Sequence, residues 1–174
     1  MKKASGFTLI ELVVVIVIFG VLAVTTAPRF LNLQTDAKNS ALLGLKGALE
    51  SAMAVSYGKL AIDGLENDGN VFFFPGVREA DWCERCYFMY GYPGNSSMTF
   101  PYLLSEITAT PNEDSDWFVG AGGAKPDQII FSFPERFEGT VLSSDNCYLQ
   151  YTASKLDIET QQVTPYTLEV IPCE

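Results

Sequence analysis

Residues 7–27 (FTLIELVVVIVIFGVLAVTTA) are the feature that most restricts how this chain can fold. Among these 21 residues only four side chains are polar, those of Thr8, Glu11, Thr25 and Thr26. An α-helix of this length spans roughly 30 Å, about the thickness of the hydrocarbon core of a bilayer. Lys2 and Lys3 precede the run, and positive charge tends to stay on the cytoplasmic side. The segment predicts a transmembrane helix with the N-terminus inside and the larger part of the chain outside.

Two simpler interpretations of this segment explain it less well. A cleaved secretory signal usually has an apolar core of about 7–15 residues and an A-x-A-like site after it. This run is longer, shows no such site, and contains a carboxylate, Glu11. A plain membrane anchor leaves Glu11 unexplained, because an acid at the bilayer centre costs roughly 2.5–3.5 kcal/mol on insertion scales. Glu11 therefore needs a positive partner, and the next basic residue is Arg29.

Proteolysis can supply the missing positive charge. A cut between Gly6 and Phe7 would place a new amine on Phe7, one helical turn before Glu11. The amine of a neighbouring subunit could then reach Glu11 if that subunit were shifted along the helix axis. A charge pair at low dielectric leaves a costly unpaired charge when it is broken. The carboxylate is therefore interpreted as a device that sets the register between subunits.

These residues resemble a known family. Gly6 followed by Phe7-Thr8-Leu9-Ile10-Glu11, after a short basic leader and before a long apolar run, resembles the signature of type IV pilins. The resemblance implies cleavage after Gly6 by a prepilin peptidase, N-methylation of Phe7, and pairing of Glu11 with the Phe7 amine of an adjacent subunit. The first 57 residues or so, with residues 28–52 (PRFLNLQTDAKNSALLGLKGALESA), are most similar to the mannose-sensitive haemagglutinin branch of these pilins.

The resemblance also implies a function, a location and partners. The expected function is that of a structural subunit, without an active site or cofactor, which polymerises into an extracellular fibre for surface attachment and biofilm formation, with motility as a further option. The precursor would lie in the inner membrane before assembly. Expected partners are other copies of the chain, the prepilin peptidase, the assembly machinery and an unidentified surface receptor.

The helix should continue beyond the apolar run. Pro28 removes one backbone hydrogen bond and crowds the preceding turn, so a kink or local loss of helix is expected here, with Gly20 contributing. In type IV pilins a matching proline lies at such a kink. After it, apolar residues recur at steps of three and four, as on one helix face: Phe30, Leu33, Ala37, Ala41, Leu45, Ala48, Ala52 and Val55. A helix from about Phe7 to Tyr57 is predicted, one-sided in its second half.

Short apolar runs separated by turn-forming residues follow this helix and indicate strands of an antiparallel sheet. They are Val71–Phe74, Tyr87–Tyr92, Ile129–Phe133, Thr140–Leu142, Cys147–Ala153 and Tyr166–Ile171, while residues 101–107 fit a short helix or an edge segment. We expect an α+β fold in which the second half of the helix packs on the sheet. The predicted organisation is a leader over residues 1–6, a transmembrane or fibre-core helix over 7–28, and a globular head over 29–174.

Charge and composition exclude several functions. Residues 60–174 hold 18 Asp and Glu against 5 Lys and Arg, a net charge of −13. Such a surface repels phosphates, so no nucleic acid is expected as a partner. The chain has no histidine, which removes imidazole-based catalysis and His-ligated zinc.

The four cysteines suit two disulfides in an oxidising compartment. Joining Cys147 to Cys173 would tie down the C-terminal segment, and this loop resembles the disulfide-bounded C-terminal region of type IV pilins. Cys83 and Cys86 lie in W-C-E-R-C, which fits a small structural disulfide but also resembles a thioredoxin-like redox motif. The βαβ context of that motif is missing. A crossed pairing with Cys147 or Cys173 remains an alternative.

The spacing of Asn112, Asp114 and Asp116 resembles the start of a calcium-binding loop. However, Trp117 stands where an EF-hand needs glycine, and the later glutamate is missing. No metal site is therefore predicted.

Two further functions stay open beside the major pilus subunit. A minor pilin or a pseudopilin of a secretion or DNA-uptake system would share the same N-terminal segment. A membrane-tethered thiol–disulfide oxidoreductase would use Cys83 and Cys86.

Overall fold

The structure is a computed structural model of the whole chain. It describes the backbone of residues 7–110, 115–121 and 128–174, and the side chains of these residues except those of 26–32 and 121. The chain divides into two compact units, residues 1–38 and residues 39–174, and each is described here by itself. The second unit is called the head below.

One long helix, α1 (Leu9–Ile62), contributes to both units. The backbone stays helical through Gly20 and Pro28, so the predicted loss of helix at these residues is not seen. A bend at this position stays a prediction. In the head, the buried side chains of α1 follow helical spacing and face the sheet: Leu42, Leu45, Leu49, Met53, Ser56 and Leu60.

The predicted apolar face of the helix was therefore partly wrong. Leu45 is buried as expected, but Ala48 is exposed and Val55 keeps 62% of its surface exposed. Both faces carry apolar residues at helical spacing. The face with the larger side chains, such as Leu42 and Met53, is the buried one, because burial stabilises in proportion to the apolar area removed from water.

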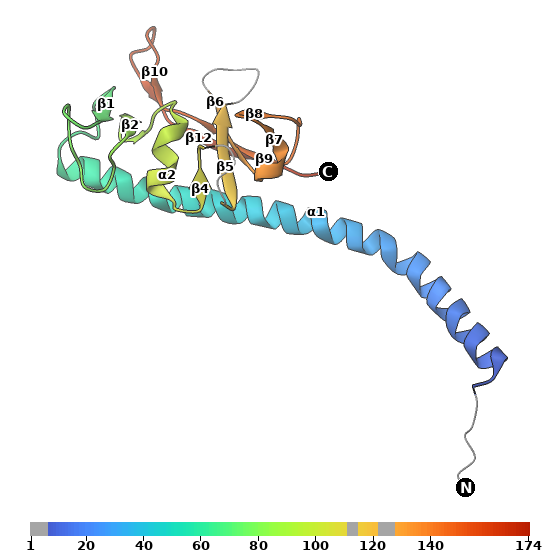
Figure 1. The fold of residues 1–174 in the computed structure, drawn as a ribbon. Coiled ribbons are helices and arrows are strands. Elements are labelled where there is room, and N and C mark those ends of the chain that lie inside the picture. Colours follow the sequence, from blue (N-terminus) through green and yellow to red (C-terminus); the bar gives the residue numbers. More distant parts are fainter. Residues whose placement is uncertain (1–6, 111–114, 122–127) are drawn as a thin grey trace. The chain divides into compact units, whose positions relative to one another are not determined.

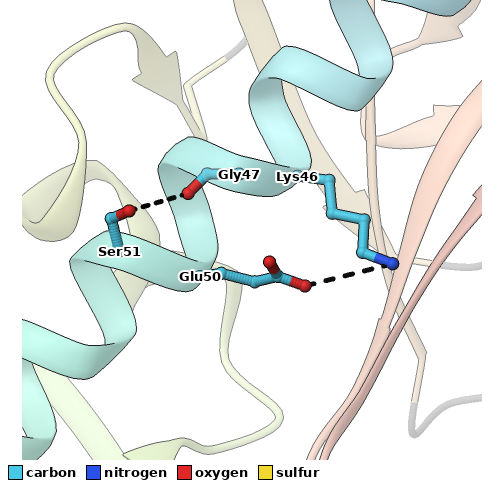
Figure 2. A network of polar contacts seen from close by, with 4 residues as sticks. All are labelled: Lys46, Gly47, Glu50 and Ser51. Carbon is cyan, nitrogen blue, oxygen red and sulfur yellow. Dashed lines mark hydrogen bonds and ion pairs between the residues drawn. The ribbon is translucent and has the colours of Figure 1, made fainter.

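Polar groups of α1 in the head make contacts one helical turn apart (Figure 2). The Lys46 ammonium lies 3.9 Å from the Glu50 carboxylate, one helical turn further on. The Ser51 hydroxyl donates to the carbonyl of Gly47 at 3.0 Å. A hydroxyl that bonds back to the preceding turn presents little unsatisfied polarity to its surroundings.

The main sheet of the head has seven strands and lies along the second half of α1 (Figure 1). Its order is β12–β9–β6–β5–β8–β7, with β4 also paired to β5. The strands are β4 (Ile107–Thr108), β5 (Trp117–Ala121), β6 (Gln128–Ser132), β7 (Phe137–Glu138), β8 (Val141–Leu142), β9 (Tyr148–Thr152) and β12 (Thr167–Ile171). The predicted α+β class is confirmed. Most pairings are antiparallel as expected, but β5 runs parallel to both β4 and β8.

A second sheet follows α1 directly. It contains β1 (Val71–Phe73), β2 (Cys86–Met89) and β3 (Tyr92–Pro93) in antiparallel order. The single strand predicted over residues 87–92 is thus two strands joined by a tight turn. Tyr90 and Gly91 in this turn have φ angles of 52° and 81°. Glycine is required at 91, because a Cβ there would lie 2.5 Å from the Tyr57 ring.

The remaining elements are short. They are the 3₁₀ turns η1 (Ser97–Thr99) and η2 (Pro134–Arg136), the helix α2 (Phe100–Leu103), and a two-stranded hairpin of β10 (Lys155–Leu156) and β11 (Val163–Thr164). The segment at residues 101–107, for which a helix or an edge segment was predicted, contains part of α2 and the first residue of β4.

The head has two hydrophobic cores. The main core joins α1 to the large sheet, with Leu42, Leu49, Phe131, Leu149 and Tyr151 among its members. The second core lies under the small sheet and consists of Leu60, Val71, Phe73, Cys83, Cys86 and Phe88. The hydroxyl of Tyr151 is buried and donates to the carbonyl of Pro93 at 2.6 Å, so the small sheet is linked to the main core by a polar contact.

Candidate functional site

Residues 7–25, called the apolar segment below, present a large apolar surface. Every side chain in it is exposed. The large apolar side chains range from 41% exposed at Val15 to 80% at Leu9. Soluble monomers rarely expose contiguous apolar patches of this extent, and such patches mark contacts with other proteins or with membranes. The segment is therefore the candidate functional site of the chain.

Glu11 takes part in capping the N-terminus of α1. The Thr8 backbone N–H and the Thr8 hydroxyl donate to Glu11 Oε2 at 2.8 and 2.7 Å. The Glu11 N–H points back to the Thr8 hydroxyl oxygen at 3.4 Å. A threonine before the first helical residue and a glutamate three positions later form a capping box, which satisfies N–H groups that have no partner within the helix.

Sequence reasoning missed this capping role of Glu11. The signal was present as Thr8-Leu9-Ile10-Glu11, which has the capping-box spacing directly before an apolar run. Both Thr8 contacts end on one carboxylate oxygen, Oε2. The capping role is thus compatible with a second contact of the same carboxylate, but it removes the argument that Glu11 has no function within its own chain.

Other predicted features of this segment are tested only in part. Residues 1–6, and with them Gly6, lie outside the described residues, so the structure does not bear on the cleavage position. Phe7 is described and 79% exposed. Around Gly20, a Cβ built on the backbone would meet no described atom within 4 Å.

The predicted transmembrane helix is not confirmed. Within the part of the chain that the structure describes, we find no helix with both the length and the apolar character needed to cross a membrane.

The C-terminal disulfide is formed as predicted, between Cys147 and Cys173. A contact that the sequence did not suggest reinforces it. The Asn39 side chain on α1 accepts the Cys173 N–H at 2.7 Å and donates to the Cys173 carbonyl at 3.3 Å. The segment after β12 is therefore joined both to the sheet, at the start of β9, and to the helix.

Cys83 and Cys86 form the second disulfide, so the crossed pairing is wrong. Both residues are buried in the second core, with 1% and 0% of their surfaces exposed. A redox-active cysteine needs access to its substrate and a setting that stabilises the thiolate. Burial among Leu60, Phe73 and Phe88 offers neither, which favours the structural role.

The predicted acidic turn at residues 112–116 is only partly visible. Residues 111–114 lie outside the described residues, and of the carboxylates in this stretch only Asp116 is described. Among the described residues, no group of three or more His, Cys, Asp or Glu is arranged to hold a metal ion.

An exposed apolar helix segment with a capped carboxylate, in a chain with a disulfide-bonded α+β head, marks the class of proteins that contact other proteins or a membrane through a helix. The comparisons with known proteins are consistent with such a contact. Residues 1–27 match the family described as "Prokaryotic N-terminal methylation motif". The chain thus carries the N-methylation motif of type IV pilins.

Two curated relatives are similar to parts of the chain. The "Type IV narrow pilus major component PilA5" of Thermus thermophilus is 43% identical over 54 residues, which are 31% of this chain and 47% of that protein. The "Probable minor fimbrial protein" of Dichelobacter nodosus is 36% identical over 81 residues, 47% of this chain and 45% of that protein. The chain thus spans about half the length of these relatives. No solved structure gives a significant match.

These comparisons show homology to a type IV pilin and to a fimbrial protein, and they do not confirm the mannose-sensitive haemagglutinin branch. They agree with the prediction of a structural protein rather than an enzyme.

Proposed function

We propose that this chain is a structural subunit of a type IV pilus, and that copies of it polymerise through their apolar segments into an extracellular fibre. The observation that carries the proposal is the exposure of every side chain from Phe7 to Thr25, next to an N-terminal methylation motif. Burying this much apolar surface against other copies would be strongly favourable and needs no directional bonds. The acidic heads would then coat the fibre.

Processing would precede assembly. A prepilin peptidase would cut after Gly6, the new N-terminus at Phe7 would be methylated, and the precursor would lie in the inner membrane until assembly machinery adds it to the fibre. The N-terminal methylation motif supports this order, because it spans residues 1–27 and so includes both the leader and the apolar segment.

Glu11 would set the axial register between copies. In our proposal the carboxylate keeps its contacts to Thr8 and also meets the cationic amine on Phe7 of an adjacent copy. An amine and a carboxylate surrounded by apolar helices lie in a low dielectric, where a mispaired register would leave an unpaired charge. The single carboxylate of an otherwise uncharged segment supports this role.

The direct test is to shear surface fibres from the source cells and identify their main protein. Electron microscopy should show thin fibres, and mass spectrometry of the main band should find a mature chain that begins at methylated Phe7. Fibres whose main band still carries residues 1–6 would contradict the processing step. Fibres that lack this chain would contradict the proposed function. We expect such fibres to serve in attachment to a surface receptor and in biofilm formation.

A minor subunit is the second candidate, because one relative is named as a minor fimbrial protein. The two candidates differ in abundance. A major subunit should be the main band of the sheared fibres, while a minor subunit should be present at a few per cent or less of that band and leave the fibre lattice intact when it is deleted.

A further inference from the structure

We infer that the heads repel one another, and that dissolved salt therefore promotes the assembly of this chain by screening them. The inference rests on the proposed function, since it concerns how copies of the chain associate. It concerns the heads rather than the apolar segment, and it predicts the sign of a salt dependence.

The charge of the chain is concentrated in the part that follows the helix. Residues 60–174 carry a net charge of −13, whereas residues 1–59 hold 6 Lys and Arg against 3 Asp and Glu. The first part is therefore close to neutral once the leader, with Lys2 and Lys3, is removed. Copies that meet through their apolar segments bring together heads of the same strong negative charge, which repel.

The head carboxylates lie where they can act on a neighbour. Within the described residues 60–174, every Asp and Glu except Glu66 is exposed. They are spread over the small sheet, the large sheet and the β10–β11 hairpin rather than gathered at one place. Glu79, Asp81 and Glu84 flank the small sheet, while Glu159, Glu169 and Glu174 lie in the hairpin turn, in β12 and after it.

Cations of the head make local contacts but do not balance its carboxylates, since residues 39–174 hold 19 Asp and Glu against 7 Lys and Arg, a net charge of −12. Arg136 donates from Nη1 to the Ser144 hydroxyl at 2.8 Å and to the main-chain and side-chain oxygens of Asn146, each at 3.1 Å. The Lys59 ammonium lies 4.7 Å from the centre of the Trp82 ring. Lys46 pairs with Glu50 on its own helix (Figure 2).

The expected response is diffuse screening rather than binding of particular ions. The described part of the chain shows no cluster of ligands that could hold a metal. Screening acts over a Debye length that falls from about 30 Å at 0.01 M to about 8 Å at 0.15 M ionic strength. Apolar attraction between the helices is not weakened by salt in this range. Repulsion between the heads should therefore dominate the salt dependence of assembly.

The experiment follows assembly of the processed full-length chain after detergent removal at ionic strengths from about 0.01 to 0.5 M, with sedimentable polymer as the readout. We expect polymer to increase with NaCl. MgCl₂ should give the same curve when both are plotted against ionic strength. Polymer that decreases with NaCl, or that responds to MgCl₂ far below the matching ionic strength, would overturn the inference.

Variants separate charge from local structure. Glu79→Gln/Asp81→Asn/Glu84→Gln should lower the NaCl concentration at half-assembly by about twofold. Glu79→Asp/Asp81→Glu/Glu84→Asp keeps the charge and should leave that concentration unchanged. The distant triple variant Glu159→Gln/Glu169→Gln/Glu174→Gln should match the first one, and an effect confined to one neutralised set would contradict diffuse repulsion.

The two hypotheses fail in different ways. Sheared surface fibres that lack this chain would contradict the proposed function, whatever the purified chain does. Purified chain that forms no polymer even at high ionic strength, or polymer that is insensitive to salt or dissolved by it, would contradict only the repulsion between heads. Circular dichroism of each variant establishes that its head is folded before the midpoints are compared.

Discussion

At the scale of single residues, Glu11 combines a role inside the chain with a proposed role between chains. The sequence indicated the second role, because a carboxylate in an apolar run needs an explanation. The structure adds the first, through the two hydrogen bonds from Thr8. Substitutions can separate the two roles, since glutamine also serves at the N3 position of a capping box but carries no charge.

We predict that Glu11→Gln loses assembly nearly as completely as Glu11→Ala, with a fall in fibre yield of about tenfold or more, because both variants lack the anion for the amine of a neighbour. Thr8→Ala is the matched control, since it removes the capping hydroxyl but keeps the carboxylate, and it should keep most of the fibre yield. Yield is measured by immunoblot of sheared fibres against the total subunit in cells. Normal fibre formation by Glu11→Gln would show that capping, rather than charge, is what assembly requires.

Tyr151 is the largest fully buried side chain among the described residues, and its hydroxyl donates to the Pro93 carbonyl at 2.6 Å. Burial raises the pKa of Tyr151 far above its usual value near 10, because an ionised phenol would lie in an apolar core. Above about pH 10 the folded state thus keeps the phenolic proton of Tyr151, whereas the unfolded state releases it. The resulting stabilisation is complete below about pH 10 and is lost as the pH rises above that value.

We predict that Tyr151→Phe lowers the free energy of unfolding of the head by about 1–2 kcal/mol at neutral pH, because the Pro93 carbonyl loses its donor. The difference from wild type should narrow above about pH 10, since only the wild type pays to keep the phenol protonated. Urea unfolding between pH 7 and pH 11 measures both effects. Tyr102→Phe, at a tyrosine that is 40% exposed, is the control. A difference that stays constant with pH would contradict the linkage.

At the scale of elements, helical spacing was sufficient to predict α1, but it did not identify the buried face. The predicted face gave alanine and Val55 the same weight as leucine. The buried face instead contains the larger side chains of Leu42, Leu49 and Met53, each one position after an alanine of the predicted face. Strand β5 was not predicted because it is short, ends in Gly120-Ala121 and lies between two stretches rich in turn-forming residues, 111–116 and 122–127. Gly120 is required there by packing, since a Cβ would lie 2.5 Å from the Thr140 carbonyl and 2.7 Å from the Phe137 ring.

Three glycines of α1 in the head, Gly44, Gly47 and Gly58, have no such packing requirement. A Cβ built at each meets nothing within 4 Å. Each costs the helix up to about 1 kcal/mol relative to alanine. The head thus gives up stability at these positions, and no contact among its described residues explains the loss.

We predict that Gly44→Ala, Gly47→Ala and Gly58→Ala each raise the free energy of unfolding of the head by about 0.5–1 kcal/mol. Alanine lowers the conformational entropy of the unfolded chain, and its Cβ meets no neighbouring atom in the folded helix. Thermal unfolding should show the increase as a melting temperature a few degrees higher. Ala48→Gly, also at an exposed position of α1, is the reverse control and should lower the melting temperature. A loss of stability on adding the methyl group would contradict the open space around these positions.

At the scale of the whole molecule, the sequence predicted the order of a helix followed by a sheet head, and the disulfide between Cys147 and Cys173. It did not predict the parallel pairs of β5, because alternation along a strand carries no information about the direction of its neighbours. It also did not predict that Asn39 binds the main chain of Cys173, a contact across 134 positions. Such long-range polar contacts depend on the assembled fold and leave no local pattern.

We predict a definite order of losses in the free energy of unfolding when the two disulfides and the Asn39–Cys173 hydrogen bonds are removed one at a time. Loss of the Cys147–Cys173 disulfide should cost about 3–4 kcal/mol, because it closes the longer loop, and loss of Cys83–Cys86 about 2 kcal/mol. Asn39→Ala should cost about 1–2 kcal/mol through its two hydrogen bonds. Urea unfolding of paired Cys→Ser variants and of Asn39→Ala measures the order. A larger loss for the Cys83–Cys86 pair would show that the small sheet depends on its disulfide for more than loop closure.

The double attachment of Cys173, to Asn39 by hydrogen bonds and to Cys147 by a disulfide, also has a consequence for biosynthesis. The ribosome makes the helix first, yet Asn39 can bind Cys173 only after more than a hundred further residues have been added. During that interval the apolar face of the helix would be exposed to other proteins, including other copies of the same chain. A cell that makes this chain therefore has reason to shelter the nascent helix until export and thiol oxidation are complete.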